Sequence, residues 1–416
     1  MFLEFELKRF FKVLFSSPGF PSALFSSFFL LLFAIGIHAS AGTRVVAWGA
    51  GTIYNPSDNN DFGQSVVPAN LTNAVQVAGG WRHSLALKAN GTVQGWGDDT
   101  VGQINFPDGD NYMAIACGVE HSLALLTNGT VSAEGDNSYG EGDVPNGLTN
   151  VVAIAAGYYH SLALESDGTV VAWGADDGVD PVGTNPNYGQ ADVPTNLASV
   201  VAISGGGYHS LALKSDGTLA EWGDQNSWGG QIPAGLSNVV AIAAGAEHNV
   251  ALLANGVLAV WGSNTFGQTN IPAGLSNVVA VAAGGFHTLA LKSNGTLIAW
   301  GAGIGTNPNV DYGQSTVPTG LTNITQITAG FVNSLVLEGS APLGLTALLT
   351  VNSLGTNGFS ISLPSRNGRV YQLEYNSSLT NPVWTGLPLQ AGNGGVLRLN
   401  DPALPATQRF YRVNRW

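Results

Sequence analysis

The chain has 416 residues, of which 56 are glycine, 10% are charged and 44% are hydrophobic. This composition fits a turn-rich all-β protein and excludes a largely disordered chain, because disordered segments are poor in hydrophobic residues. The formal net charge of -13 is uneven: residues 42–338 carry five Lys and Arg against 23 Asp and Glu, whereas residues 339–416 carry six Arg against two acids. An acidic body of this size repels phosphate backbones, so we expect no nucleic-acid partner.

The first 41 residues have the pattern of an export signal. Three basic residues within the first 12 precede an apolar run over residues 23–37, and Ala39-Ser40-Ala41 follow. A charged region, an apolar core and small residues in this order are typical of a signal peptide cleaved after residue 41. An uncleaved anchor is the alternative, because the segment is long and contains two glutamates. We therefore expect a secreted or cell-envelope protein, with no membrane contact beyond this segment, since no later run reaches about 18 apolar residues.

Residues 42–338 contain a repeat of about 39 residues. A phrase close to H-S-L-A-L recurs at spacings of 38, 39, 49, 39, 39 and 46, and opens at His83, His121, His160, His209, His248, His287 and Asn333. An alternating apolar run ending in Gly precedes each phrase. An Asn-Gly or Asp-Gly pair and a strand ending in W-G follow most of them, and these pairs predict type I′ hairpin turns. With a short outer strand from the Y-G-Q…V-P segment, each repeat predicts four antiparallel strands, the size of a propeller blade.

The number of repeats predicts how the chain ends meet. There are seven H-S-L-A-L phrases and seven strands of the V-x-x-W-G kind. The first such strand, at residues 44–49, has no hairpin before it, and the last hairpin, ending near Glu338, has no such strand after it. Pairing these two segments in one blade removes the open edges of the ring. The sequence therefore predicts a closed seven-bladed β-propeller.

The repeated pattern A-A-G-x-x-H-S-L-A-L…D-G-x-V-x-A-W-G…Y-G-Q resembles the regulator of chromosome condensation repeat family over residues 43–338. In its short repeat, its "VVAWG" start and its unpaired last hairpin, the chain is most similar to the secreted propeller-type (type II) inhibitors of beta-lactamases. This resemblance implies the propeller fold. It leaves function open, because the family includes an exchange factor for a small GTPase, a UV-B photoreceptor and inhibitors.

The repeat stops after residue 338. Five short alternating segments are predicted to be strands, at residues 358–364, 369–375, 383–389, 395–399 and 409–416. We therefore predict three parts: the signal segment at residues 1–41, the propeller at residues 42–338, and a small β-sandwich-like accessory domain at residues 339–416. The sequence does not specify the role of that last domain.

The two variable residues of each A-G-x-x-H loop are the candidate site. Because strand directions alternate, these loops and the W-G…Y-G-Q loops are expected on one face of the propeller. Five of the seven variable pairs contain an aromatic residue, and aromatic residues dominate protein–protein hot spots. In the inhibitors that the chain resembles, the corresponding face grips the enzyme. We predict partner-binding residues at Trp81, Tyr158, Tyr159, Tyr208, Phe286 and Phe331. The alternative is that these aromatics plug the mouth of a central channel.

The recurring residues are interpreted as scaffold. The histidine is expected to bond to neighbouring backbone, the tryptophan of each W-G strand to pack between blades, and Cys117 to be a buried, inert thiol. We expect no catalytic residues, no cofactor and no metal site. Three insertions at residues 50–62, 175–188 and 302–312 are rich in Asp, Asn and Pro, and the sequence leaves open whether they bind calcium.

These observations favour an exported, non-catalytic, monomeric propeller that binds an unidentified protein partner, either inhibiting or docking it. Two alternatives use other chemistry. The same face could bind or hydrolyse carbohydrate, since rings beside carboxylates suit sugars. The wider family resemblance implies a guanine-nucleotide exchange factor. Neither alternative is marked by a dedicated motif.

Overall fold

A computed structural model of the chain describes residues 43–52, 60–109, 111–175, 187–224, 230–303, 310–339, 350–355, 358–365, 369–376, 384–392, 396–402 and 409–415. The predicted signal segment and most of the three insertions lie outside these residues. The described residues form strands, turns and loops, and none of them belongs to a helix that could span a membrane.

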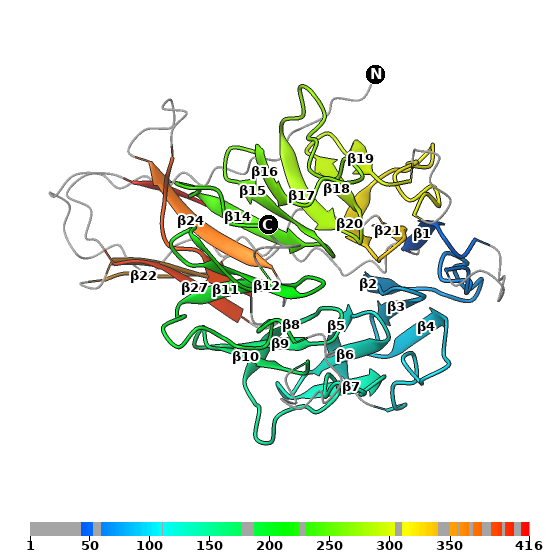
Figure 1. Cartoon of the computed structure of the whole chain (residues 1–416). Helices are drawn as coiled ribbons and strands as arrows, with labels where there is room; N and C mark the ends of the chain where they lie inside the picture. The colour runs from blue at the N-terminus through cyan, green and yellow to red at the C-terminus, as the bar shows by residue number, and fades with distance from the viewer. Residues whose placement is uncertain are drawn as a thin grey trace, which may run out of the picture.

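Seven three-stranded antiparallel sheets form the blades of a propeller, and they surround a central axis in Figure 1. Neighbouring inner strands contact one another around the ring, so that β2 lies against both β5 and β20. Taken in order, the blades are β2 (Ala74–Gly79), β3 (His83–Lys88) and β4 (Val93–Gly97); β5 (Tyr112–Cys117), β6 (His121–Leu126) and β7 (Val131–Gly135); β8 (Val151–Ala156), β9 (Ser161–Glu165) and β10 (Val170–Trp173); β11 (Val200–Gly205), β12 (His209–Lys214) and β13 (Leu219–Gly223); β14 (Val239–Ala244), β15 (His248–Leu253) and β16 (Leu258–Gly262); β17 (Val278–Ala283), β18 (His287–Lys292) and β19 (Leu297–Gly301); β20 (Ile324–Ala329), β21 (Asn333–Glu338) and β1 (Arg44–Gly49).

The last blade confirms the predicted closure. Strand β1 pairs with β21 from Arg44 opposite Glu338 to Gly49 opposite Asn333. The Arg44 guanidinium also lies 3.2 Å from the Glu338 carboxylate. The first strand of the propeller is therefore the outer strand of its last blade, and this blade has the same three strands as the other six.

Within the described residues the predicted fourth strand of the blades is absent, so this prediction is wrong. The Y-G-Q…V-P segments form turns instead. In these turns, local hydrogen bonds use backbone N–H groups that a strand would need for pairing. The Gln64 side chain, for example, accepts the Phe62 N–H through Oε1 at 2.9 Å, and Gly63 has a φ of +83°. The proline that follows each such segment has no N–H to donate to a ladder.

The hairpin turns also differ from the prediction. In the first blade the Gly91 N–H bonds to the Lys88 carbonyl at 2.9 Å, and Gly91 has a φ of +81° while Asn90 does not have a positive φ. A type I′ turn needs a positive φ at both central residues. The observed geometry matches the three-residue hairpin loop in which glycine follows a tight turn.

The middle strands form the core of the ring. Leu85, Leu123 and Leu211 are 0% exposed, and equivalent leucines of other blades are as deeply buried. The six tryptophans of the W-G strands are 5–7% exposed. Trp48, Trp96, Trp173, Trp222 and Trp300 each donate an indole N–H to the backbone carbonyl of a Y-G-Q or Y-G-E segment. These tryptophans are scaffold, as the repeat predicted.

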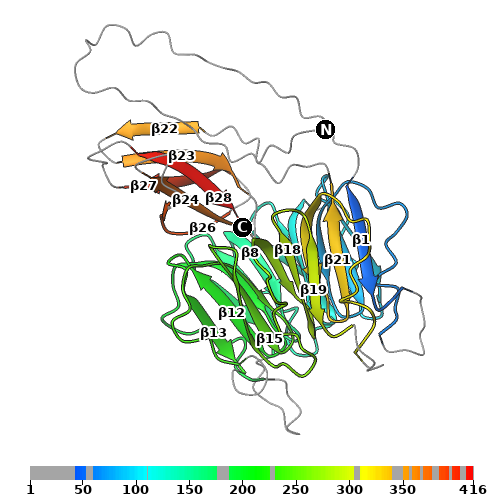
Figure 2. The same ribbon diagram turned by 90° about the horizontal axis from the view of Figure 1, so that it is seen from above.

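The C-terminal region forms two sheets, shown beside the propeller in Figure 2. One sheet contains β22 (Thr350–Gly355), β23 (Gly358–Pro364) and β27 (Val396–Asp401), and the other contains β24 (Val370–Asn376), β25 (Thr385–Gly386), β26 (Gln390–Ala391) and β28 (Phe410–Arg415). Side chains of both sheets share one hydrophobic cluster, as in a β-sandwich. Strand β22 was not predicted, and the predicted strand at residues 383–389 is present only as the short β25.

The C-terminal module rests on the propeller edge that carries the hairpin turns. The Leu389 N–H donates to the Ser215 carbonyl at 2.8 Å, in the turn between β12 and β13. Val370 and Leu389 pack in the same hydrophobic cluster as Val240 and Leu213 of the propeller. This docking covers part of the turn face, opposite the A-G-x-x-H loops.

Candidate functional site

The recurring histidines form a belt between the blades. The Nε2 atom of each lies 2.8–3.1 Å from a side-chain oxygen of the next blade, in the pairs His83–Ser122, His121–Ser161, His160–Ser210, His209–Asn249, His248–Thr288 and His287–Ser334. Asn333 takes the seventh position and donates to the Ser84 hydroxyl at 3.4 Å. The expected bond to neighbouring backbone is therefore wrong, because the partner is the side chain that follows the next blade's histidine or asparagine.

The hydrogen-bond pattern fixes the protonation state of the belt. The Ser161 and Ser210 hydroxyls donate to backbone carbonyls at 2.8 Å, so they accept a hydrogen bond from the histidine Nε2–H. Each histidine is therefore a neutral Nε2–H tautomer, and the Nδ1 atoms have no hydrogen-bond partner within the described residues. Burial lowers the pKa of four belt histidines to about 3 and of the other two to about 4.

The glycine of A-G-x-x-H makes room for the belt. A Cβ on Gly157 would lie 2.1 Å from Cε1 of His160 and 2.6 Å from the carbonyl oxygen of Gly206 in the next blade. The histidines are also 0% exposed, so a ligand on the surface cannot reach their rings. The repeated glycine and histidine thus hold adjacent blades together and do not form a site.

The two variable residues of each loop form two concentric rings on the A-G-x-x-H face. A central cavity of about 300 Å³ is lined by the inner strands and by six of the seven residues at the first variable position, but by none at the second. We call the first set the inner ring: Trp81, Val119, Tyr158, Gly207, Ala246, Gly285 and Phe331. The second set is the outer ring: Arg82, Glu120, Tyr159, Tyr208, Glu247, Phe286 and Val332.

The inner-ring aromatics lie at the mouth of the cavity. Phe331 contacts Trp81, Tyr158 and Phe286 with ring centroids 5.8, 5.6 and 5.1 Å apart. A Cβ on Gly285 would lie 2.6 Å from the Phe331 ring, so this glycine makes space for it. The Tyr158 hydroxyl is buried and has no hydrogen-bond partner within the described residues. Trp81, Tyr158 and Phe331 therefore have the position that the channel-plug alternative requires.

The structure brings all six predicted aromatics into one connected cluster. Tyr158 joins the inner ring to the outer ring, with centroids 6.1 Å from Tyr159 and 5.6 Å from Tyr208. All six side chains are half-buried, so each offers part of its ring to solvent. Half-exposed aromatic clusters are typical of binding surfaces. Their role in binding stays a prediction.

The Y-G-Q loops add three aromatics that the sequence reading missed. Tyr139 contacts Tyr159, Tyr188 contacts Tyr208, and Phe266 contacts Phe286, with centroids 5.0, 5.1 and 4.9 Å apart. Each is the aromatic residue two positions before the buried Gln or Glu of its loop. The recurrence of this aromatic in the loops predicted for the same face was the signal that could have found them.

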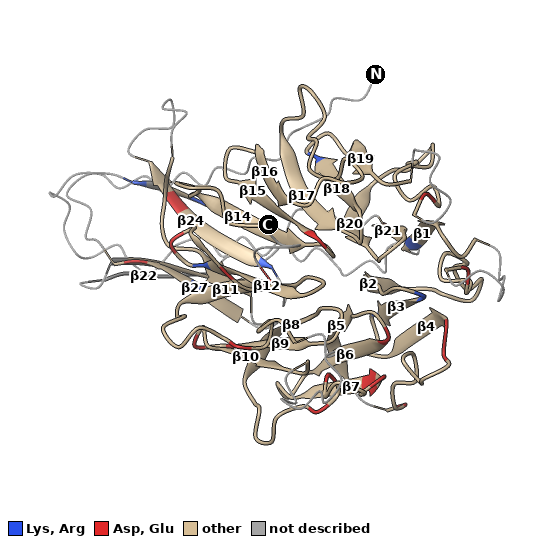
Figure 3. Cartoon of the chain, in the orientation of Figure 1, with Lys and Arg blue, Asp and Glu red and all other residues tan. Residues whose placement is uncertain are grey.

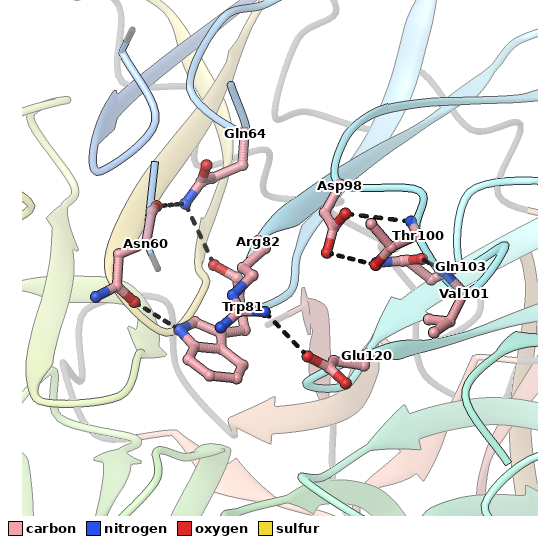
Figure 4. Close-up of polar contacts among 9 residues, drawn as sticks. All are labelled: Asn60, Gln64, Trp81, Arg82, Asp98, Thr100, Val101, Gln103 and Glu120. Carbon is pink, nitrogen blue, oxygen red and sulfur yellow. Dashed lines mark hydrogen bonds and ion pairs between the residues drawn. The ribbon is translucent and has the colours of Figure 1, made fainter. Parts of the chain in front are cut away.

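Charged groups surround the aromatic cluster, as Figure 4 shows for one blade boundary. Arg82 lies 3.8 Å from the Trp81 ring centroid and 3.3 Å from the Glu120 carboxylate. The Trp81 indole donates to Asn60 at 2.8 Å. Burial raises the pKa of Glu120 and of Glu247. Arg82 is the single basic residue of the two rings, and the face is otherwise acidic.

The described residues give no support for a metal or thiol site. They contain no group of three His, Cys, Asp or Glu side chains that could hold a metal ion. Cys117 lies in the cavity wall as a residue of intermediate exposure, and its thiol is desolvated. Desolvation raises the pKa of its thiol to about 12, so it is a poor nucleophile at neutral pH.

The family model of the regulator of chromosome condensation (RCC1) repeat matches residues 74–103, 114–141, 151–178, 239–268 and 278–307. No curated protein sequence matches the chain. The matched segments fall in five of the seven blades.

Solved structures share the fold. Prp20p from Saccharomyces cerevisiae, described with its binding properties to Gsp1p and histones, is 21% identical, with a TM-score of 0.55 over 72% of this chain and 91% of that chain. Yeast RCC1 (Prp20) bound to Kap60 is 21% identical, with a TM-score of 0.54 over 72% and 89%. Human WBSCR16 is 19% identical, with a TM-score of 0.53 over 72% and 100%. At these identities the similarity establishes the fold alone.

Proposed function

The chain is built from regulator of chromosome condensation repeats, and we propose that it is an exported, non-catalytic propeller that binds a protein partner through its A-G-x-x-H face. One observation carries this proposal. Nine aromatic rings of that face form a connected, half-exposed cluster, and six of them stand at positions that vary from blade to blade within a frame whose buried positions repeat.

The chemistry of the face supports binding rather than catalysis. Aromatic rings supply most of the energy of protein interfaces when they sit near the centre of a contact and lose water together. The histidines are the residues best suited to proton transfer at neutral pH, but their Nε2 atoms are engaged in the belt and their rings are 0% exposed. The exposed part of the face therefore offers contact area and charge.

The opposite face is less available. The C-terminal module packs on the hairpin-turn side through Leu389 and Val370, and its backbone bonds to Ser215. The C-terminal module does not make these contacts on the A-G-x-x-H face. This supports the proposed inhibitor or docking role, because such a role needs one face that can cover part of another protein.

Export is part of the proposal and rests on residues 1–41. Their basic start, apolar run and small residues have the pattern of a signal segment. The absence of an internal disulfide fits either compartment, because Cys117 is the single cysteine of the sequence. We expect the partner in the extracellular or envelope space.

An exchange-factor role is the second candidate, favoured by the fold that the chain shares with Prp20p, which binds Gsp1p. A small GTPase loaded with a fluorescent guanine nucleotide tests it. Faster nucleotide release with the full chain would support this role, and release at the intrinsic rate would remove it.

The protein-binding proposal is tested by affinity capture from secreted and envelope fractions with the full chain as bait. Three baits are compared: wild type, a Tyr159→Ala/Tyr208→Ala variant, and Asn294→Asp, an exposed turn residue between β18 and β19 that keeps its acceptor oxygen. The proposal expects a partner retained by wild type and by Asn294→Asp but lost with the tyrosine variant. Equal capture by all three baits would contradict it.

A further inference from the structure

Four successive blades place an acidic and aromatic arc on the outer ring. In blade order the residues are Glu120, Tyr159, Tyr208 and Glu247. Tyr159 and Tyr208 have ring centroids 6.0 Å apart, and both contact Tyr158 of the inner ring. Two carboxylates therefore flank a group of three tyrosines near the mouth of the cavity.

The two carboxylates of the arc differ in their partners. Glu120 pairs with Arg82 at 3.3 Å. For Glu247, no Lys or Arg within the described residues forms an ion pair, and the Ser263 side chain is its hydrogen-bond partner. Glu247 is half-buried, so it keeps less than the full hydration of a surface carboxylate. A half-buried carboxylate without a cation is stabilised by any cation that docks beside it.

The loops that carry Tyr208 and Glu247 lie side by side, because the Gly207 N–H bonds to the Gly245 and Ala246 carbonyls at 3.2 Å. Burial is the main cause of the raised pKa of Tyr158 and of Tyr208, and the charge of Glu247 adds to both. The Tyr158 hydroxyl is buried without a hydrogen-bond partner within the described residues. Tyrosine rings and a carboxylate around one space attract a cation with a nonpolar stem, because the ring faces are negative and the stem covers the rings.

The charge around the arc is also negative, like that of its two carboxylates. Figure 3 shows acidic residues on the loops of several blades. Asp98, Asp136 and Asp224 directly follow W-G or E-G strands and bond to the backbone of the outer ring. The long-range field and the local arc thus both favour a positively charged partner.

We propose that the arc of Glu120, Tyr159, Tyr208 and Glu247 receives a Lys or Arg side chain that the protein partner presents from an apolar segment. The inner-ring Trp81 and Phe331 take the apolar neighbours of that basic residue, since they extend the same cluster without adding charge. This inference rests on the proposed function and adds the chemistry of the partner to it.

A random peptide library displayed on phage and selected against the full chain tests the inference. Phage that bind the Tyr159→Ala variant equally well are discarded, so that the peptides kept depend on the face. Peptides with Lys or Arg beside aromatic or aliphatic residues are expected among them. The best peptide is then synthesised in two forms, one with the basic residue and one with norleucine in its place.

Titration of both peptides separates the possible outcomes. Glu247→Gln is expected to weaken the basic peptide at least tenfold, to leave the norleucine peptide unchanged, and to reduce the salt dependence of binding. Asp167→Asn removes the same charge from an exposed turn on the other face and is expected to change affinity less than twofold. Face-dependent peptides without a basic residue, or unchanged binding to Glu247→Gln, would overturn the inference while the proposed function stands. A failure to obtain any peptide that depends on Tyr159 would count against both.

Discussion

The histidine belt and the outer ring are built from adjacent residues of the same loops. Tyr159 and His160 are neighbours in the chain, but His160 is 0% exposed and bonds to Ser210 of the next blade, whereas Tyr159 is half-buried among other tyrosines. Six of seven loops keep the histidine, while the outer ring ranges from Arg82 to Val332. The difference shows how a repeat separates two tasks: the position that touches the next blade is fixed, and the position before it is free to vary.

The largest expected effect comes from removing the strand that closes the ring. Deleting residues 44–49 removes β1 and leaves β21 without its outer partner. Because the blades contact one another around the ring, we expect the loss of a cooperative thermal transition rather than a local change. A deletion variant that unfolds at the wild-type temperature would show that closure by β1 does not stabilise the ring. The stability of the ring would then have to come from contacts other than β1.

Acid should break the belt before it affects the outer ring. The belt histidines have pKa values of about 3 or 4 in the folded protein, against about 6.5 when unfolded. The unfolded chain therefore binds more protons as pH falls below about 6.5, and stability declines by up to about 1.4 kcal/mol per pH unit for each histidine. Glu141 and Glu221 oppose this, since burial raises the pKa of each to about 7 and the folded state binds their protons first.

Burial also raises the pKa of Glu120, Glu134 and Glu247, so five glutamates oppose six histidines, and the net stability should fall between pH 6.5 and pH 4.5 by less than the histidines alone would give. Urea unfolding at pH 7, 6 and 5 measures this change. His160→Asn, which cannot titrate, should reduce the slope of stability against pH by about one proton. A flat profile over this range would contradict the buried, neutral state of the belt.

A single belt position should affect stability and leave the face intact. His160→Ala leaves the buried Ser210 hydroxyl without its donor, at a cost of about 1–3 kcal/mol. His160→Asn should cost less, because Asn333 shows that an amide can take this position and bond to the next blade. Chemical denaturation of both variants checks the order. Equal stability of wild type and His160→Ala would remove the structural role of the belt.

The smallest expected effect concerns the buried acid beneath the outer ring. Glu141 is 1% exposed and stands where other blades have glutamine, with its carboxylate accepting the Tyr139 N–H at 2.8 Å. Its folded pKa of about 7 lies above the ordinary value of 4.5, so the stability that the protonated form contributes is lost as pH rises from about 4.5 to about 7. Glu141→Gln should therefore stabilise by about 1 kcal/mol at pH 8 and by less at pH 5. A loss of stability at both pH values would contradict this.

The repeat predicted the ring and its closure because both depend on pattern. The unpaired segment at residues 44–49 and the last hairpin are visible in the sequence, and their pairing follows from the count. The predictions of a fourth strand and of type I′ turns were wrong because of local contacts and local backbone geometry. The Gln64 side chain and the positive φ of Gly63 and Gly91 use contacts that the hydrophobic pattern does not reveal.

The candidate site was partly predictable. The variable loop positions gave the six aromatics and the channel-mouth alternative, but not which three of them, Trp81, Tyr158 and Phe331, line the cavity. The contacts of Tyr139, Tyr188 and Phe266 depend on how the loop after one blade meets the A-G-x-x-H loop of the next blade in space. The docking of Leu389 beside Ser215 joins segments that share no sequence pattern, so the sequence did not predict it.

The separation of recognition from stability is tested most directly by one pair of neighbouring variants. The affinity of the captured partner is measured for the folded fractions of Tyr159→Ala and His160→Ala, with the unfolding free energy of each measured alongside. Tyr159→Ala should weaken binding by about 2 kcal/mol or more with little change in stability, while His160→Ala should lose stability and bind normally. Normal binding by Tyr159→Ala together with weakened binding by folded His160→Ala would contradict the account.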